Sequence, residues 1–230
     1  MERFLITGAS RGIGRAIAIR LARADRTLLL HGRDKNALEA SAQMVRDRGA
    51  WAMSLTADLS TTGGVEELVA KVGGDALHLL VNNAGVAFVG PVEKITMDQW
   101  EKTLAVNVTA PFLLIQKLLP LMVRGASIVN ILSVAARTVF PDWSAYCMSK
   151  FALDGFAKSL REELRPRGIR VINIYPSATA TGIWDKVEGT WDKNAMLPPE
   201  ETAEAVAYAL ERPESVVVED ISLGNLAGNQ

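Results

Sequence analysis

Two polar side chains in the second half of the chain have the types and spacing needed for proton transfer. Tyr146 and Lys150 are four residues apart in a segment of helical pattern, so they share one helix face. A lysine ammonium beside a phenol favours the phenolate and lowers the tyrosine pKa from about 10 toward neutral pH. The pair could therefore exchange a proton with a carbonyl or hydroxyl oxygen. A core tyrosine beside a solvated lysine is the alternative explanation.

Two further polar residues could complete such a site. Ser133 follows an apolar run at 126–132, where the end of a parallel strand would present its hydroxyl to a ligand. Asn107 lies inside a long helical pattern at 97–123, which is an unfavourable position for asparagine on propensity alone. Each residue taken alone has an ordinary structural explanation.

A glycine-rich turn at residues 7–14 joins the first apolar run to the first helical pattern. Gly8, Gly12 and Gly14 would let the backbone turn sharply and approach a pyrophosphate, next to the free N–H groups of a helix N-terminus. The spacing is G-x-x-x-G-x-G rather than G-x-G-x-x-G. Glycines alone are weak evidence, because any tight turn between a strand and a helix favours them. The prediction of nucleotide binding therefore rests on the position of this turn, directly after the first strand.

The elements that must position these residues alternate along the chain. Strands are predicted at 3–7, 27–31, 52–56, 77–81, 126–132, 169–175 and 216–218. Helices are predicted at 12–24, from 35 onward, and at 63–72, 97–123, 144–165 and 200–211. This alternation predicts an α/β fold, a doubly wound Rossmann-type parallel sheet of about seven strands, in one domain spanning residues 1–230.

Composition argues against several other classes of protein. The net charge of -1 gives no footprint for nucleic acid. A single cysteine, Cys147, excludes a disulfide framework, and His31 and His78 have no neighbours in sequence that suggest a metal site. No apolar run approaches the ~20 residues that span a membrane, and Gly-x-Ser-x-Gly is absent. We expect a cytoplasmic protein without a metal and without nucleic-acid or membrane partners.

Further motifs follow the glycine turn in a fixed order. They are Asn82-Asn83-Ala84-Gly85, Ser133, Tyr146-x-x-x-Lys150, and Pro176 followed by Thr181. From about residue 2 to 220 the chain resembles the classical short-chain dehydrogenase/reductase family. The resemblance implies hydride transfer between a nicotinamide dinucleotide and a ketone or secondary alcohol. It also implies the catalytic set Asn107, Ser133, Tyr146 and Lys150.

The family assigns each of these four residues a role. Tyr146 would donate or accept the proton, and Ser133 would bond the substrate oxygen. Lys150 would support the tyrosine electrostatically and bond the nicotinamide ribose. Asn107 would mark a helix irregularity whose carbonyl holds a water connected to the lysine.

The end of the second predicted strand bears on the choice of cofactor. An acidic residue there selects NAD, whereas a nearby arginine accommodates the 2′-phosphate of NADP. The resemblance places Gly32 at the acid's position, Arg33 at the basic position, and Arg11 at a second phosphate contact. Guanidinium groups suit phosphate, so we predict NADP(H). Solvated surface arginines are the alternative, and Asp34 adds negative charge nearby.

Other cofactor contacts follow from the same resemblance. Asp58 and Leu59 would contact adenine, although Asp58 could instead cap a turn. The full expected NADP(H) set is Gly8, Ser10, Arg11, Gly12, Ile13, Gly14, Arg33, Asp58, Leu59, Asn83, Ala84, Gly85, Tyr146, Lys150, Pro176 and Thr181. Two residues depart from the family pattern: Ser177 replaces a glycine and His78 replaces an aspartate.

The irregular stretch 177–199, which carries Trp184 and Trp191, predicts a substrate lid, with a surface insertion as the alternative. Candidate cleft walls are Phe88, Ala135, Val139, Phe140, Trp143 and Trp184. They indicate an uncharged or partly apolar ketone or alcohol; a 3-oxoacyl thioester, a 3-hydroxy acid and a steroid-like ketone stay open. The helices at 97–123 and 144–165 resemble those that pair subunits in the family, so we expect a homodimer or homotetramer.

A dinucleotide-sensing protein without turnover is the alternative function. All four catalytic positions carry the family residues, which a sensor would not need. Oxidation of NADPH with a panel of ketones distinguishes the two hypotheses.

Overall fold

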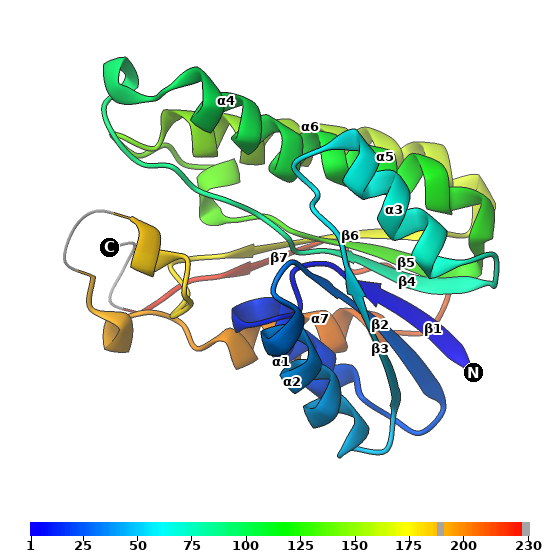
Figure 1. Cartoon of the computed structure of the whole chain (residues 1–230). Helices are drawn as coiled ribbons and strands as arrows, with labels where there is room; N and C mark the ends of the chain where they lie inside the picture. The colour runs from blue at the N-terminus through cyan, green and yellow to red at the C-terminus, as the bar shows by residue number, and fades with distance from the viewer. Residues whose placement is uncertain (188–190, 227–230) are drawn as a thin grey trace.

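The computed structural model describes residues 1–187 and 191–226, and its centre is one parallel sheet (Figure 1). The seven strands lie in the order β3-β2-β1-β4-β5-β6-β7. They are β1 (Glu2–Ile6), β2 (Arg26–Gly32), β3 (Trp51–Thr56), β4 (Leu77–Asn82), β5 (Met122–Ile131), β6 (Arg170–Pro176) and β7 (Asp220–Leu223). Every adjacent pair is parallel, which confirms the predicted Rossmann-type sheet.

Helices cover both faces of this sheet (Figure 1). One layer contains α1 (Gly12–Leu21), α2 (Lys35–Arg46) and α7 (Pro199–Leu210), and the other contains α3 (Thr62–Val72), α4 (Met97–Leu104), α5 (Ala110–Leu118) and α6 (Ser144–Leu164). Alternate strand residues fill two cores: Leu28 and Leu30 belong to the first, and Leu5 and Leu29 to the second. Burial on both faces explains why the strands are continuous apolar runs in the sequence.

The helical pattern at 97–123 forms two helices rather than one. A π-helical turn at Ala105–Thr109, which contains Asn107, separates α4 from α5. This agrees with the irregularity that the family resemblance implied there. Pro120 lies in a 3-10 turn after α5, because proline does not fit a helix interior, and β5 starts at Met122 rather than at 126.

Within the stretch Met97–Leu121, an 18-residue window has a mean hydropathy of 1.5, so by length and composition alone the stretch could cross a membrane. The sequence expectation that no stretch reaches this length therefore needs correction. In the structure, Leu114 and Leu118 of this stretch pack into the core on the α3–α5–α6 side of the sheet. The α5 part of this stretch accordingly belongs to the core of the α/β fold.

The last strand differs from the prediction: β7 occupies Asp220–Leu223, not 216–218. The β-branched run at 216–218 drew the prediction, but Val216 donates its N–H to the Pro213 carbonyl in a turn (2.8 Å). The strand itself is fixed by Arg161 of α6, whose guanidinium donates to the Glu219 carbonyl (2.8 Å) and to the Asp220 carboxylate (2.9 Å).

The carboxyl ends of all parallel strands meet at one edge of the sheet. The strand order reverses between β1 and β4, so a crevice for a ligand is expected outside the ends of these two strands. The segment after β6 extends beyond the same edge (Figure 1) and contains two 3-10 turns, Trp184–Lys186 and Lys193–Ala195. A bridge between Thr179 and Leu197 closes its base.

Candidate active site

The glycine turn after β1 is bonded to the loop after β4. The Thr7 hydroxyl accepts from the N–H groups of Asn83 (2.9 Å) and Ala84 (3.0 Å). The Asn83 amide donates to the carbonyls of Thr7 (2.8 Å) and Gly8 (3.2 Å). A Cβ at Gly14 would lie 2.3 Å from the Gly8 carbonyl oxygen, so this close packing requires glycine. The two loops at the β1–β4 reversal are therefore hydrogen-bonded to each other and closely packed.

The N-terminus of α1 fits an anionic group. Its N-cap residue is Arg11, whose side chain provides no cap within the described chain, so first-turn N–H groups stay available. The Ser10 hydroxyl is buried and finds no hydrogen-bond partner among the described residues. A Cβ at Gly32 would lie 2.0 Å from this hydroxyl, so the end of β2 closely approaches the turn. Narrow walls and unpaired donors suit a dinucleotide phosphate.

His31 supports the glycine turn, a role that the sequence did not reveal. Its Nδ1 accepts from the Gly8 N–H (3.4 Å), and its Nε2 faces the Ala57 carbonyl (3.2 Å). This pairing assigns the ring proton to Nε2. Burial lowers the pKa of His31 to about 4, so the ring is neutral at physiological pH. The available signal was a histidine directly after three leucines in a strand.

Acidic groups near the end of β2 are already engaged. The Asp34 carboxylate caps α2 by accepting from the N–H groups of Asn36 (3.1 Å) and Ala37 (3.0 Å). The hydrogen bond from the Ser60 N–H lowers the pKa of the Asp58 carboxyl. The charge of the exposed Arg33 lowers it further. The Asp34 carboxylate is therefore occupied by the α2 N-terminus and, in the described part of the chain, is not paired with its neighbour Arg33, which the sequence predicts to select NADP.

The segment after β6 packs against the glycine turn. A Cβ at Gly12 would lie 3.0 Å from the Thr181 side chain, which places the predicted contact Thr181 beside the turn. Arg11 extends toward this segment as well. Its charge is one of the causes that lower the pKa of the Asp185 carboxyl, after the bond from Lys193. The two predicted phosphate-binding arginines therefore have different surroundings: the charge of Arg33 acts on Asp58, and the charge of Arg11 acts on Asp185.

Ser177, which follows the strand-ending Pro176, is buried. Its N–H donates to the Leu223 carbonyl (2.8 Å), which extends the pairing of β6 with β7. Its hydroxyl has no hydrogen-bond partner among the described residues. The serine that departs from the family pattern thus adds a buried, unsatisfied hydroxyl at this edge of the sheet.

The predicted catalytic residues converge on the ends of β4 and β5. Lys150 Nζ donates to the Ile131 carbonyl (3.0 Å) and lies 5.6 Å from the centre of the Tyr146 ring. Ser133 follows β5, its hydroxyl accepts from the Ala135 N–H (3.1 Å), and its side chain is near enough to Tyr146 to act on the pKa of that phenol. The helical spacing of α6 and the end of β5 therefore position the three side chains together.

Asn107, in the π-helical turn, ties this group to the loop after β4. Its amide oxygen accepts from the Val86 N–H (2.9 Å), and its Nδ2 donates to the Val86 carbonyl (2.9 Å) and to the Ser149 hydroxyl (3.0 Å). The Ser149 hydroxyl donates in turn to the Tyr146 carbonyl (2.7 Å). A Cβ at Gly85 would lie 3.4 Å from Asn107 Oδ1 and 3.9 Å from the lysine Nζ.

Burial shifts the two titratable groups of the site in opposite directions. It raises the pKa of Tyr146 to about 12, and the hydrogen bond with Ser133 acts weakly against this shift. It lowers the pKa of the Lys150 ammonium to about 8. The expectation that the lysine lowers the tyrosine pKa toward neutrality is therefore wrong for this structure, because desolvation dominates. At pH 7 the tyrosine is a protonated acid and the lysine is charged.

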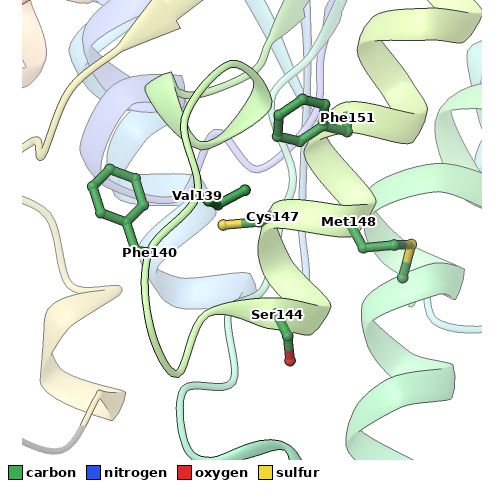
Figure 2. Close-up of a pocket in the computed structure, with 6 residues that line it drawn as sticks. All are labelled: Val139, Phe140, Ser144, Cys147, Met148 and Phe151. Atoms are coloured by element: carbon green, nitrogen blue, oxygen red, sulfur yellow. The ribbon is translucent and has the colours of Figure 1, made fainter.

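The opposite side of α6 forms an apolar pocket of about 450 Å³ (Figure 2). Figure 2 shows Cys147 pointing toward Val139. The pocket is lined by Val139, Phe140, Ser144, Cys147, Met148 and Phe151. The expected cleft walls Val139 and Phe140 therefore line a pocket on the Cys147 side of α6, whereas Trp143 contacts Tyr146 directly, with 5.5 Å between ring centres.

Comparison with known proteins decides the family. The model of the short chain dehydrogenase family matches residues 2–191. The chain belongs to the short-chain dehydrogenase family. The sepiapterin reductase of Chlorobaculum tepidum is 37% identical over 98% of this chain and 96% of that protein. The D-threitol dehydrogenase of Mycolicibacterium smegmatis is 34% identical over 89% and 84%.

Solved structures of similar proteins share the fold of this short-chain dehydrogenase. The alcohol dehydrogenase of the archaeon Thermococcus sibiricus, complexed with 5-hydroxy-NADP, has a TM-score of 0.90, 28% identity, and coverage of 100% of this chain and 99% of that chain. The landomycin C-6 ketoreductase LanV with bound NADP and rabelomycin has a TM-score of 0.85, 31% identity, and coverage of 96% and 94%.

Proposed function

We propose that this short-chain dehydrogenase is an NADP(H)-dependent enzyme that interconverts ketones and secondary alcohols. The observation that carries the proposal is the convergence of Tyr146, Lys150, Ser133 and Asn107 at the carboxyl edge of the sheet, beside the glycine turn. Similar proteins that are described as an alcohol dehydrogenase with 5-hydroxy-NADP and a ketoreductase with NADP support the choice of reaction and cofactor.

The residues around the glycine turn would hold the dinucleotide. The N-terminus of α1 and the Ser10 hydroxyl would bind the phosphates, and Asp58 would contact the adenine. Arg33 would bind the 2′-phosphate that distinguishes NADP from NAD. Lys150 would bond the nicotinamide ribose, with Thr181 beside the carboxamide. When bound, NADPH supplies the hydride that reduces the carbonyl carbon.

The protein's own residues handle the proton. With a pKa of about 12, Tyr146 carries its phenolic proton at pH 7 and can donate it to the carbonyl oxygen as the carbon is reduced. Ser133 holds that oxygen in position by a second hydrogen bond. The charged Lys150 stabilises the phenolate that forms, and a water on the Asn107 carbonyl would return the proton. In alcohol oxidation the same proton moves in reverse.

The proposal is tested by NADPH oxidation with a panel of ketones, repeated with NADH. We expect turnover with at least one class of ketone and a preference for NADPH. Tight binding of NADPH with no turnover for any ketone or alcohol would favour the alternative, a dinucleotide-sensing protein.

We also propose that the enzyme is a homodimer or homotetramer in the cytoplasm. Two large apolar side chains, Phe112 of α5 and Phe151 of α6, are each 42% exposed on the outer layer. Covering them with the same helices of a second copy would remove this apolar surface from water. Analytical ultracentrifugation should show a dimer or tetramer that Phe151→Glu dissociates, and a monomeric wild type would refute the proposal.

A further inference from the structure

Three tryptophans gather beside the proposed proton donor. We refer to Trp143, Trp184 and Trp191 as the tryptophan cluster. Trp143 precedes α6, whereas the other two belong to the segment after β6, so the fold joins residues more than 40 positions apart. Their ring centres are separated by 5.7 Å (Trp143–Trp184), 4.7 Å (Trp184–Trp191) and 6.4 Å (Trp143–Trp191). Trp143 also meets the Tyr146 ring edge-to-face, with centres 5.5 Å apart.

The polar atoms of two of these indoles are already used. The Trp184 N–H donates to the Thr179 carbonyl (2.8 Å), and the Trp191 N–H donates to the Val187 carbonyl (3.3 Å). These bonds hold the rings in fixed orientations and leave carbon edges and faces to contact a ligand. All three tryptophans are partly exposed, so part of that apolar surface is accessible.

Two charged side chains of the same segment, Lys193 and Asp185, are paired with each other. Lys193 Nζ bonds the Asp185 carboxylate, and the charge of Arg11 also acts on Asp185. The two indole N–H groups and the Lys193 ammonium are therefore already engaged and are not free to bind an anionic substrate group. The chemistry of the cluster favours an uncharged, flat, apolar group, because aromatic rings pack on aromatic clusters by offset or edge-to-face contact.

We propose that the substrate is a ketone whose carbonyl is attached to a planar aromatic ring system. The ring packs on the tryptophan cluster while the carbonyl oxygen reaches Tyr146 and Ser133. Reduction breaks the C=O π bond: hydride from NADPH forms the new C–H bond and the Tyr146 proton forms the O–H bond. The products are the aryl carbinol and NADP⁺, and the tyrosine regains its proton from solvent. This inference rests on the proposed function.

Two ketones of similar size can separate the effect of a flat aromatic ring on kcat/KM from the general reactivity of the enzyme toward ketones. Acetophenone and cyclohexyl methyl ketone differ in having a flat or a puckered ring. We expect Trp184→Leu to lower kcat/KM for acetophenone by about 2- to 13-fold, the range for one aromatic pair, and to change kcat/KM for cyclohexyl methyl ketone much less. Trp184→Phe should retain most of the preference. Trp51→Leu is the matched control, since Trp51 is exposed on the outer strand β3.

A binding measurement gives a readout that does not depend on turnover. Saturable quenching of tryptophan fluorescence by acetophenone should occur in the wild type and in Trp51→Leu, and should weaken in Trp184→Leu. An equal loss with both ketones, or a wild type that prefers the cyclohexyl ketone, would overturn the inference while leaving ketone reduction intact. If neither ketone turns over, the proposed function is in doubt, and the quenching titration alone decides whether the cluster binds aromatic rings.

Discussion

Replacing Arg33 by alanine should weaken the use of NADPH far more than the use of NADH. Arg33 follows β2 at an exposed position, and the nearby Asp34 carboxylate is committed to capping α2. A charge-assisted hydrogen bond from arginine to a phosphate contributes about 1.5–3 kcal/mol. At 1.36 kcal/mol per tenfold change, kcat/KM for NADPH should fall by about 10- to 150-fold. Exposure and salt screening favour the lower part of this range.

The assay compares kcat/KM for NADPH and NADH at two ionic strengths with one ketone, together with direct titration of NADPH. Arg48→Ala is the matched control, because Arg48 is an exposed arginine in the turn before β3, away from the carboxyl edge of the sheet. It should leave both values unchanged. Equal losses for the two cofactors in Arg33→Ala, or a wild type that already prefers NADH, would refute the assignment of the β2 end.

Three other outcomes follow from the structure. Gly32→Asp combined with Arg33→Ile should reverse the cofactor preference to NADH, which steady-state kinetics with both cofactors would show. Overall activity should fall, because the new Cβ would lie 2.0 Å from the Ser10 hydroxyl and force it to move. Because burial lowers the pKa of Lys150 to about 8, its charge costs stability below pH 8, and this cost fades as pH rises toward the unfolded value of about 10.4. Lys150→Met should therefore raise Tm at pH 7 and raise it less at pH 10. The same substitution should shift the onset of alcohol oxidation to higher pH, and an unmoved pH–rate profile would contradict the role of Lys150 in stabilising the phenolate. Hydrogen exchange at 179–187 and 191–197 should slow when NADPH and a ketone bind, and unchanged exchange would make this segment a passive loop.

The parallel sheet was predictable because its central strands are apolar on both faces. β7 was not, since Asp220 and Ser222 alternate with apolar residues along a strand with no fully buried residue, while the valines before it mimic a strand. The start of β5 was missed for a related reason: the helical period continues through 118–123, and only Pro120 marks its end. Local patterns therefore identified the elements but placed several of their ends incorrectly.

The candidate site divides in the same way. Tyr146 and Lys150 share a helix face by spacing alone, so their proximity could be predicted. The support from His31, the anchoring of Asn107 to Val86, and the tryptophan cluster depend on contacts between distant segments. Desolvation of the tyrosine also depends on the folded environment, which explains why its predicted pKa shift had the wrong sign.

Turnover of Tyr146→Phe, measured alongside its affinity for NADPH, tests the central claim most directly. The substitution removes the phenolic proton and keeps the ring against Trp143, so the packing around the site is preserved. We expect ketone reduction to fall by about 10²- to 10⁴-fold, the contribution of one general acid, while NADPH binding followed by fluorescence changes little. Turnover close to that of the wild type would contradict the assignment of Tyr146 as proton donor and the catalytic account built on it.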